Sequence, residues 1–329
     1  MSVLAPTLQA FFTDRLIRQR QVSNHTLAAY RDTLRLLVRF ASGRRKVEPV
    51  KLEISDLDSA LISAFLDHRE HECGNSVRTR NARLTAIRSL FRYAVLRHPE
   101  HAEVIQHVLA IPPKRFERRV VSFLTAPEVD ALLAAPDRST WTGRRDHTLF
   151  ATAVQTGLRV SELIGLRISD VHLGVGPHIS CIGKGRKQRI TPLTKSAVAL
   201  LRTWLRERGG QLSDSVFITR TGRTLSRDAL ERRLAECVAT SRTKCPSLRE
   251  KRITLHVLRH TAAMRLLHAG VDLSIIALWL GHEQMETTQI YLHADLALKE
   301  KALARTTPMN TRPGRYRPPD ALLAFLEAL

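Results

Sequence analysis

The chain has 329 residues, of which 43% are hydrophobic, and 52 Lys and Arg against 31 Asp and Glu give a formal net charge of +21. This length is enough for about two domains with their own cores. No stretch approaches the roughly 18 uninterrupted apolar residues of a membrane span, and the N-terminus lacks the pattern of a signal peptide, so we expect a cytoplasmic protein without a membrane partner.

The positive charge extends over the whole chain, with 20 basic against 12 acidic residues in 1–118 and 32 against 19 in the rest. Because the cations are mostly arginines and are clustered, they indicate that the protein binds a polyanionic partner rather than that the charge only increases solubility. The cysteines form no CxxC pair, which favours free thiols over a disulfide frame or a zinc cage. They are Cys73, Cys181, Cys237 and Cys245.

The N-terminal third has the apolar spacing of helices packed against one another. Ser23 and Ser76 are expected as N-caps, and Gly43 and Gly74 are expected to follow helix ends. The pattern predicts a four-helix domain over 1–110, followed by a basic, Pro-containing linker over 111–122. The four helices are expected at 8–20, 23–42, 57–72 and 76–98.

The fourth of these helices is cationic, since no acidic residue lies between Cys73 and Pro99. A solvated helix face usually carries Glu for pairing with its cations. We therefore expect this helix to contact DNA, although a plain solvated face is the alternative. The expected DNA-binding residues are Arg78, Arg80, Arg83, Arg88 and Arg92.

After the linker the pattern becomes mixed. Thr125 and Glu128 have the spacing of a capping box, and Gly157 is expected to separate two helices within 147–171. β-Branched runs around a Gly-Lys-Gly turn predict a hairpin over 178–193. The fold class is therefore mainly α with a small β-sheet. Further helices are expected at 195–208, 226–241, 254–269, 273–281, 285–305 and 320–329, the last after Pro- and Arg-rich coil.

Five short motifs follow one another in this second region: "TGLRVSEL", "GKGRK", "HVLRH", "LGH" and "TTQIYLHAD". Each is weak by itself, but in this order they resemble the tyrosine recombinases, the lambda-type phage integrase family, and most closely its Xer-like members. The resemblance implies a helical, SAM-like core-binding domain over 1–110 and an α+β catalytic domain over 123–305. It also implies that the tail, 306–329, docks on a neighbouring protomer, and packing of its helix on its own protomer is the alternative.

The resemblance assigns site residues one by one. Tyr291 matches the nucleophile, and five residues match the group that surrounds the scissile phosphate: Arg159, Lys184, His256, Arg259 and His282. Glu162 and His260 match supporting positions. Lys184 shares its hairpin with other cations, so Lys187 is the substitute candidate for the catalytic lysine, while Arg186 and Lys187 are expected to contact the DNA backbone.

The chemistry needs these residue types. The attack on a phosphodiester adds negative charge to the non-bridging oxygens, which Arg159 and Arg259 are suited to hold. His256 is the candidate acceptor of the Tyr291 proton, and Lys184 the candidate donor to the leaving 5′-oxygen. The resemblance implies a 3′-phosphotyrosine intermediate and a Holliday junction. Rejoining then needs neither ATP nor a metal, so no cofactor is expected.

The expected partners are double-stranded DNA with an inverted-repeat core site and further copies of the chain in a homo-tetramer on synapsed DNA. Such an integrase or transposase of a mobile element would be nucleoid-associated. A zinc site is disfavoured because no HExxH motif is present. Two other functions stay open: a non-catalytic, sequence-specific DNA-binding regulator, since 271–291 also resembles a helix-turn-helix, and a type IB topoisomerase-like or resolvase enzyme.

Overall fold

The computed structural model of the chain describes residues 4–116, 121–183, 188–282 and 286–294. The chain divides into two compact units, Met1–Arg118 and Arg119–Leu329, and each is described by itself. Within the described residues, no helix is both long and apolar enough to cross a membrane.

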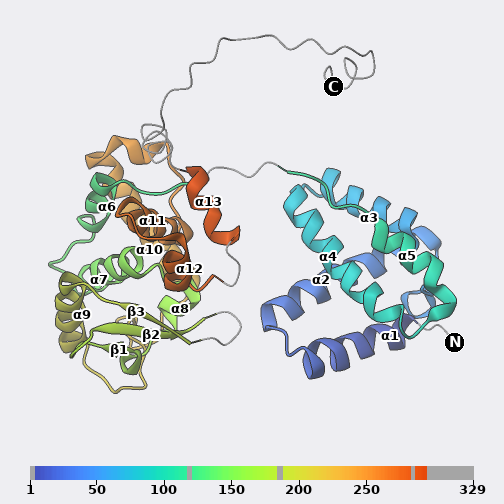
Figure 1. Cartoon of the computed structure of the whole chain (residues 1–329), viewed down its shortest axis with the longest axis horizontal. Coiled ribbons are helices and arrows are strands. Elements are labelled where there is room, and N and C mark those ends of the chain that lie inside the picture. Colours follow the sequence, from blue (N-terminus) through green and yellow to red (C-terminus); the bar gives the residue numbers. More distant parts are fainter. Residues whose placement is uncertain (1–3, 117–120, 184–187, 283–285, 295–329) are drawn as a thin grey trace, which may run out of the picture. The chain divides into compact units, whose positions relative to one another are not determined.

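The described residues of the N-terminal unit, 4–116, form helices and no strand (Figure 1). Its core is a single cluster that includes Phe11, Leu37, Phe65, Ile87 and Ile105. The α-helices are α1 (Leu4–Ala10), α2 (Asn24–Arg45), α3 (Ser59–His71), α4 (Val77–Ala94) and α5 (Ala102–Ala110). A π-helix, η1 (Phe11–Gln19), continues α1, and short 3-10 turns lie at Pro49–Lys51 and Pro99–His101.

Capping side chains set where these helices begin. Ser23 accepts a hydrogen bond from the backbone N–H of Thr26, and Ser76 accepts one from that of Thr79, as the sequence predicted. Two expectations were wrong. Helix α2 runs through Gly43 and ends at Lys46 in the left-handed conformation, and α5 adds a fifth helix beyond the four that were expected.

The second unit places helices around a small sheet (Figure 1). Three antiparallel strands pair in the order β1-β2-β3, with Ser180 opposite Ile190 in the expected hairpin. The strands are β1 (Val171–His172), β2 (His178–Ile182) and β3 (Gln188–Pro192). The helices are α6 (Ala126–Leu133), α7 (Trp141–Thr156), α8 (Val160–Ile164), α9 (Lys195–Arg208), α10 (Arg227–Lys244), α11 (Leu255–His268), α12 (Leu273–Leu280) and α13 (Glu286–Ala294), with 3-10 turns at Ile168–Asp170 and Pro246–Arg249.

These bounds confirm the capping box of Thr125 and Glu128, the turn at Gly157 and the hairpin. They also confirm the fold class, mainly α with a small sheet. The main core cluster of the unit includes Phe150, Trp204 and Phe217. A smaller cluster joins α11, α12 and α13 around Met264, Leu280 and Tyr291. The last 35 residues, with the expected helix at 320–329, lie outside the described residues.

Candidate active site

The "TGLRVSEL" motif forms the turn between α7 and α8. Gly157 ends α7 with a φ of +64°, and a Cβ there would lie 2.6 Å from the Leu280 side chain, so both conformation and space require glycine. Arg159 is the N-cap of α8. Its backbone N–H and one guanidinium nitrogen donate to the two carboxylate oxygens of Glu162, each at 2.8 Å, and a second nitrogen donates to the Gly281 carbonyl at 2.9 Å.

Helix α11 contributes Arg259, whose side chain is buried. It donates to the carbonyl oxygens of Gly157 and Leu280, both at 2.6 Å. Burial, together with the nearby Arg159 and Arg189, lowers the pKa of Arg259 to about 10, so this guanidinium is still charged at pH 7. His256, one turn earlier, is exposed, and its ring centroid lies 4.1 Å from that of His260.

Tyr291 lies on α13 and is only 1% exposed. Its Oη is 3.1 Å from Nδ1 of His260. Burial raises the pKa of Tyr291 to about 12, although Arg259 and Arg159 act in the opposite direction. Burial and the neighbouring His256 and Arg259 lower the pKa of His260 to about 3. At pH 7 the phenol therefore keeps its proton and the imidazole of His260 is neutral, and these two groups lie within hydrogen-bond distance of each other.

His282 follows the turn at Gly281. Its Nδ1 lies 2.8 Å from Oγ1 of Thr288, and its ring is nearly parallel to that of Tyr291 with 6.3 Å between centroids. Burial and then the charges of Arg259 and Arg159 lower the pKa of His282 to about 4. This histidine is therefore neutral at pH 7, and its second ring nitrogen is the one left for another partner.

Arg189 on β3 is a residue of this group that the sequence interpretation missed. Its side chain is 8% exposed, and it donates to Glu162 at 2.6 Å and to the Leu280 carbonyl. From the sequence, the hairpin cations are expected to contact the DNA backbone. Strand alternation places Arg189 and Thr191 on one face of β3 and Ile190 on the other. Hydrophobicity favours burial of the Ile190 face, but Ile190 is 60% exposed, and Arg189 and Thr191 face inward.

The structure thus brings together most of the residues named from the motifs. Arg159 and Arg259 donate to the carbonyl oxygens of Gly281 and Leu280, respectively. His282 directly follows this turn, and Tyr291 contacts His260. Glu162 forms an ion pair with Arg159. Three of the named residues, Lys184, Arg186 and Lys187, lie outside the described residues.

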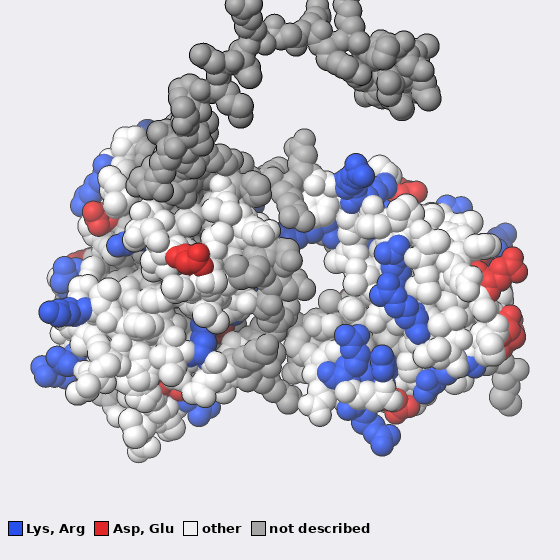
Figure 2. Space-filling view, viewed as in Figure 1, with Lys and Arg blue, Asp and Glu red and all other residues white. Residues whose placement is uncertain are grey.

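The arginines of α4 do not share one environment. Arg78 and Arg92 are exposed, whereas Arg83 and Arg88 are half-buried, and Arg88 donates to the Ile111 carbonyl. Arg80 is 5% exposed, with its Nε 3.5 Å from the Glu70 carboxylate. The expectation that Arg80 lies on a DNA-facing surface is therefore wrong. Figure 2 shows Lys and Arg side chains gathered on the viewed face of this unit, with fewer acidic ones.

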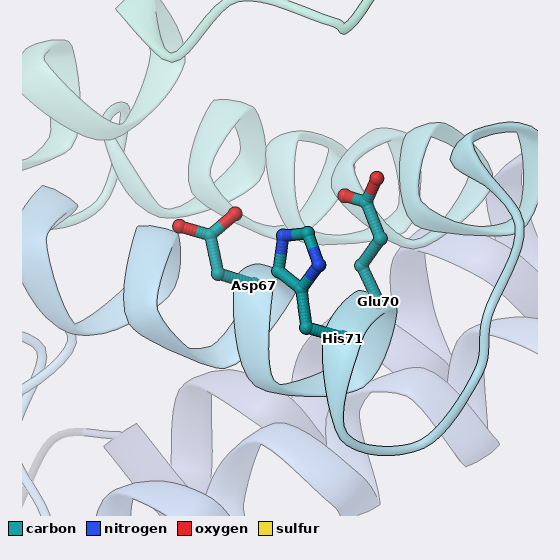
Figure 3. A group of neighbouring side chains, drawn as sticks. All are labelled: Asp67, Glu70 and His71. Carbon is teal, nitrogen blue, oxygen red and sulfur yellow. The ribbon is translucent and has the colours of Figure 1, made fainter.

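One group in the described part of the chain has metal-ligand spacing: Asp67, Glu70 and His71, on successive turns of α3 (Figure 3). Its carboxylates already have cationic partners. Lys114 donates to Glu70 at 2.8 Å and to Asp67 at 3.4 Å, and Arg80 also faces Glu70. This group is therefore better explained as an anchor for the chain after α5 than as a metal site.

Both parts of the chain match known protein families. Residues 122–297 match the phage integrase family, and residues 10–98 match the SAM-like N-terminal domain of phage integrases. The chain belongs to the phage integrase family, the tyrosine recombinases, which are DNA strand-transferring enzymes. This membership favours the recombinase over the non-catalytic regulator.

Its relatives cover almost the whole chain. An integrase/recombinase of Sinorhizobium fredii is 55% identical over 328 residues, which is 99% of this chain and 98% of the relative. Tyrosine recombinase XerC of Xanthomonas campestris is 34% identical, over 86% of this chain and 83% of the relative. Tyrosine recombinase XerD of Listeria monocytogenes is also 34% identical, over 88% and 95%.

Solved structures show the same fold. The XerH site-specific recombinase, in a post-cleavage complex with its palindromic difH substrate, aligns with a TM-score of 0.70 at 24% identity, over 87% of this chain and 81% of that one. A lambda integrase dimer bound to a COC′ core site aligns with a TM-score of 0.61 at 20% identity, over 86% and 96%. At these identities the likeness concerns the fold.

Proposed function

We propose that this protein cuts and rejoins DNA at a specific inverted-repeat site, through a covalent link between the DNA 3′-phosphate and Tyr291. The observation that carries the proposal is that Arg159 and Arg259 both bind carbonyl oxygens of the Leu280–Gly281 turn, which His282 directly follows. Tyr291 is buried in the same unit. These residues come from four separate segments of the chain.

The charge of this group is suited to a phosphodiester. Arg159, Arg189 and Arg259 bring three positive charges, and Glu162 is the carboxylate that two of them bind. The buried pocket therefore has excess positive charge, which a DNA phosphate would neutralise. Arg159 is the most exposed of the three arginines, at 30% of its side chain, and is the one best placed to reach a phosphate oxygen.

Each step of the proposed reaction forms one phosphoester bond and breaks another, so the number of these bonds does not change. Oη of Tyr291 attacks the phosphorus, the bond from phosphorus to the 5′-oxygen breaks, and the products are a 3′-phosphotyrosine and a free 5′-hydroxyl. The hydroxyl of another strand then attacks the phosphotyrosine and releases Tyr291. One pair of such exchanges forms a Holliday junction, and a second pair resolves it. Each lost donor to the non-bridging oxygens should cost on the order of 10²- to 10³-fold in rate.

The proton of Tyr291 needs an acceptor. His260 contacts Oη in this structure, but a base with a pKa of about 3 accepts a proton poorly at neutral pH. We therefore assign His260 to holding the hydroxyl and keep His256, which is exposed, as the proposed base. Lys184, with Lys187 as the substitute, is proposed to protonate the leaving 5′-oxygen.

The proposed assembly follows from the proposed recombination reaction. Recombination joins two duplexes, so four copies of the chain would act on one synapse, with the tail over 306–329 docking on the next copy. The arginines of α4 that stay exposed, Arg78 and Arg92, are proposed to contact the DNA backbone. The proposed location is the nucleoid, and the proposed role is movement or integration of a mobile element.

The test uses a nicked suicide duplex that carries the inverted-repeat site selected by the protein from random DNA. The wild-type chain should form a covalent complex that survives denaturing electrophoresis, while Tyr291→Phe should bind the same duplex and form none. The recombinase assignment fails if the Phe variant still exchanges strands. A type IB topoisomerase would instead relax plasmids that lack the site.

A further inference from the structure

Arg189 is buried at the centre of the site although it is not one of the residues that the motifs assign. It comes from β3, while its partners come from α8 and from the end of α12. Its Nε is buried and has no hydrogen-bond partner in the described structure, so Arg189 acts through its two terminal nitrogens.

The first of these nitrogens meets Glu162. That carboxylate has one oxygen 2.8 Å from the guanidinium of Arg159 and the other 2.6 Å from the guanidinium of Arg189. The oxygen bound by Arg189 also accepts the backbone N–H of Arg159 at the start of α8. Arg189 therefore fixes the carboxylate that in turn orients Arg159.

The second nitrogen meets the carbonyl oxygen of Leu280. The same oxygen accepts a hydrogen bond from Arg259 at 2.6 Å. The next residue, Gly281, has a φ of +64°, and a Cβ there would lie 2.8 Å from the Arg189 guanidinium. The turn is thus built around Arg189, and Arg259 shares its acceptor.

We propose that Arg189 is a positioning residue that holds both phosphate-binding arginines, Arg159 through Glu162 and Arg259 through the Leu280 carbonyl. The proposal rests on the function proposed above, because it gives those two arginines a phosphate to bind. Arg189 itself is too enclosed to touch DNA. The planar guanidinium serves the two acceptors with two separate nitrogens held in a rigid fork, whereas a lysine would have to reach both acceptors from one flexible ammonium nitrogen.

The test compares two substrates in single-turnover cleavage. One is the nicked suicide duplex with its natural scissile phosphate, and the other carries a methylphosphonate there, which replaces a charged non-bridging oxygen by a methyl group. If Arg189 acts by placing Arg159 and Arg259 against that charge, Arg189→Met should slow cleavage of the phosphate by about 10- to 100-fold. On the uncharged methylphosphonate the loss should shrink to within about threefold of wild type.

Arg208→Met is the matched control. Arg208 is also buried, and it donates to the carbonyls of Ser215 and Gly209 within the same unit, away from the site. Arg208→Met should lower the stability of the unit. Its cleavage rate per folded molecule should change by the same factor on the two substrates. Arg189→Lys keeps the charge and serves if the Met variant does not fold, and it too should lose more on the phosphate than on the methylphosphonate.

Two results overturn the proposal. One is cleavage of the natural phosphate by both Arg189 variants within about twofold of wild type. The other is an equal loss on the two substrates, which would make Arg189 a merely structural residue. Wild type and Tyr291→Phe run beside them, and absence of a covalent complex from wild type would instead refute the proposed function together with this inference.

Discussion

At the scale of single residues, the site is governed by burial of titratable groups among arginines. His260 and His282 are neutral at pH 7 because burial and positive neighbours lower their pKa values to about 3 and about 4. The ordinary pKa of histidine is about 6.5. The unfolded chain therefore binds more protons than the folded chain below pH 6.5, and stability must fall as the pH falls through this range.

The first prediction concerns this pH dependence. His260→Asn keeps an acceptor near the position of Nδ1 but does not titrate, so its melting temperature should fall less than that of wild type between pH 7.5 and pH 5. Tryptophan fluorescence measures the correct unit, because the three tryptophans, Trp141, Trp204 and Trp279, all lie in the second one.

His172→Asn, at an exposed position of β1 in the same unit, is the control, and it should leave the pH dependence of wild type unchanged. An equal fall for wild type and His260→Asn would contradict the proton linkage assigned to His260.

At the scale of elements, helices that end in glycine position the two arginines of the candidate site, Arg159 and Arg259. Both α7 and α12 end in a left-handed glycine, Gly157 and Gly281. The Gly157 carbonyl binds Arg259 and the Gly281 carbonyl binds Arg159. The two helix ends therefore serve as hydrogen-bond acceptors for the arginines as well as turns.

The second prediction follows from the packing of Gly157. Gly157→Ala should destabilise the second unit by about 2–4 kcal/mol, because a left-handed alanine costs roughly 1 kcal/mol and the overpacking against Leu280 and Ala262 adds about 1–3 kcal/mol. Gly222→Ala, at a φ of +78° with open space around it, should cost only about 1 kcal/mol. Denaturant unfolding followed by tryptophan fluorescence measures both, and equal losses would remove the packing argument.

The third prediction separates the arginines of α4. Arg78→Gln and Arg92→Gln should each lower the slope of log affinity against log salt concentration by about 0.9, as expected for one lost phosphate contact. Arg80→Met should leave the slope unchanged but destabilise the N-terminal unit, because Arg80 is buried against Glu70. DNA binding at several salt concentrations is the measurement. A reduced slope in the Arg80 variant would return that residue to the DNA interface.

At the scale of the whole molecule, the charge of +21 suits a protein that binds DNA. The tail is the part of the chain proposed to join copies rather than to bind DNA. Its last ten residues, 320–329, are mostly apolar. Burying even one leucine side chain contributes about 1.5–3 kcal/mol, so loss of this segment should weaken contacts between protomers.

The fourth prediction uses deletion of residues 318–329. Binding to a single site should stay within about twofold of wild type, while synapsis of two sites should fall by about tenfold or more, the equivalent of one lost apolar anchor. Mobility shifts on one-site and two-site DNA measure the two quantities. If the tail packs on its own protomer, both activities should fall together.

The sequence by itself determined the local features of this protein. Apolar periodicity and capping side chains such as Ser23, Ser76 and Thr125 placed helix starts correctly, because these signals act within one or two turns. The order of the motifs was enough to predict the family. Helix α5 was not predicted from the sequence because it is short and close to the linker prolines.

Only the tertiary structure decided which charged side chains lie inside. Arg189 and Arg80 belong to cationic stretches that resemble solvated surfaces, yet each is buried because a carboxylate on a neighbouring element, Glu162 of α8 or Glu70 of α3, lies opposite. The contact of His260 with Tyr291 likewise joins residues 31 positions apart. A buried charge or hydrogen bond is stable only with its partner in place, and the partner is chosen by packing between distant segments, which no local pattern records.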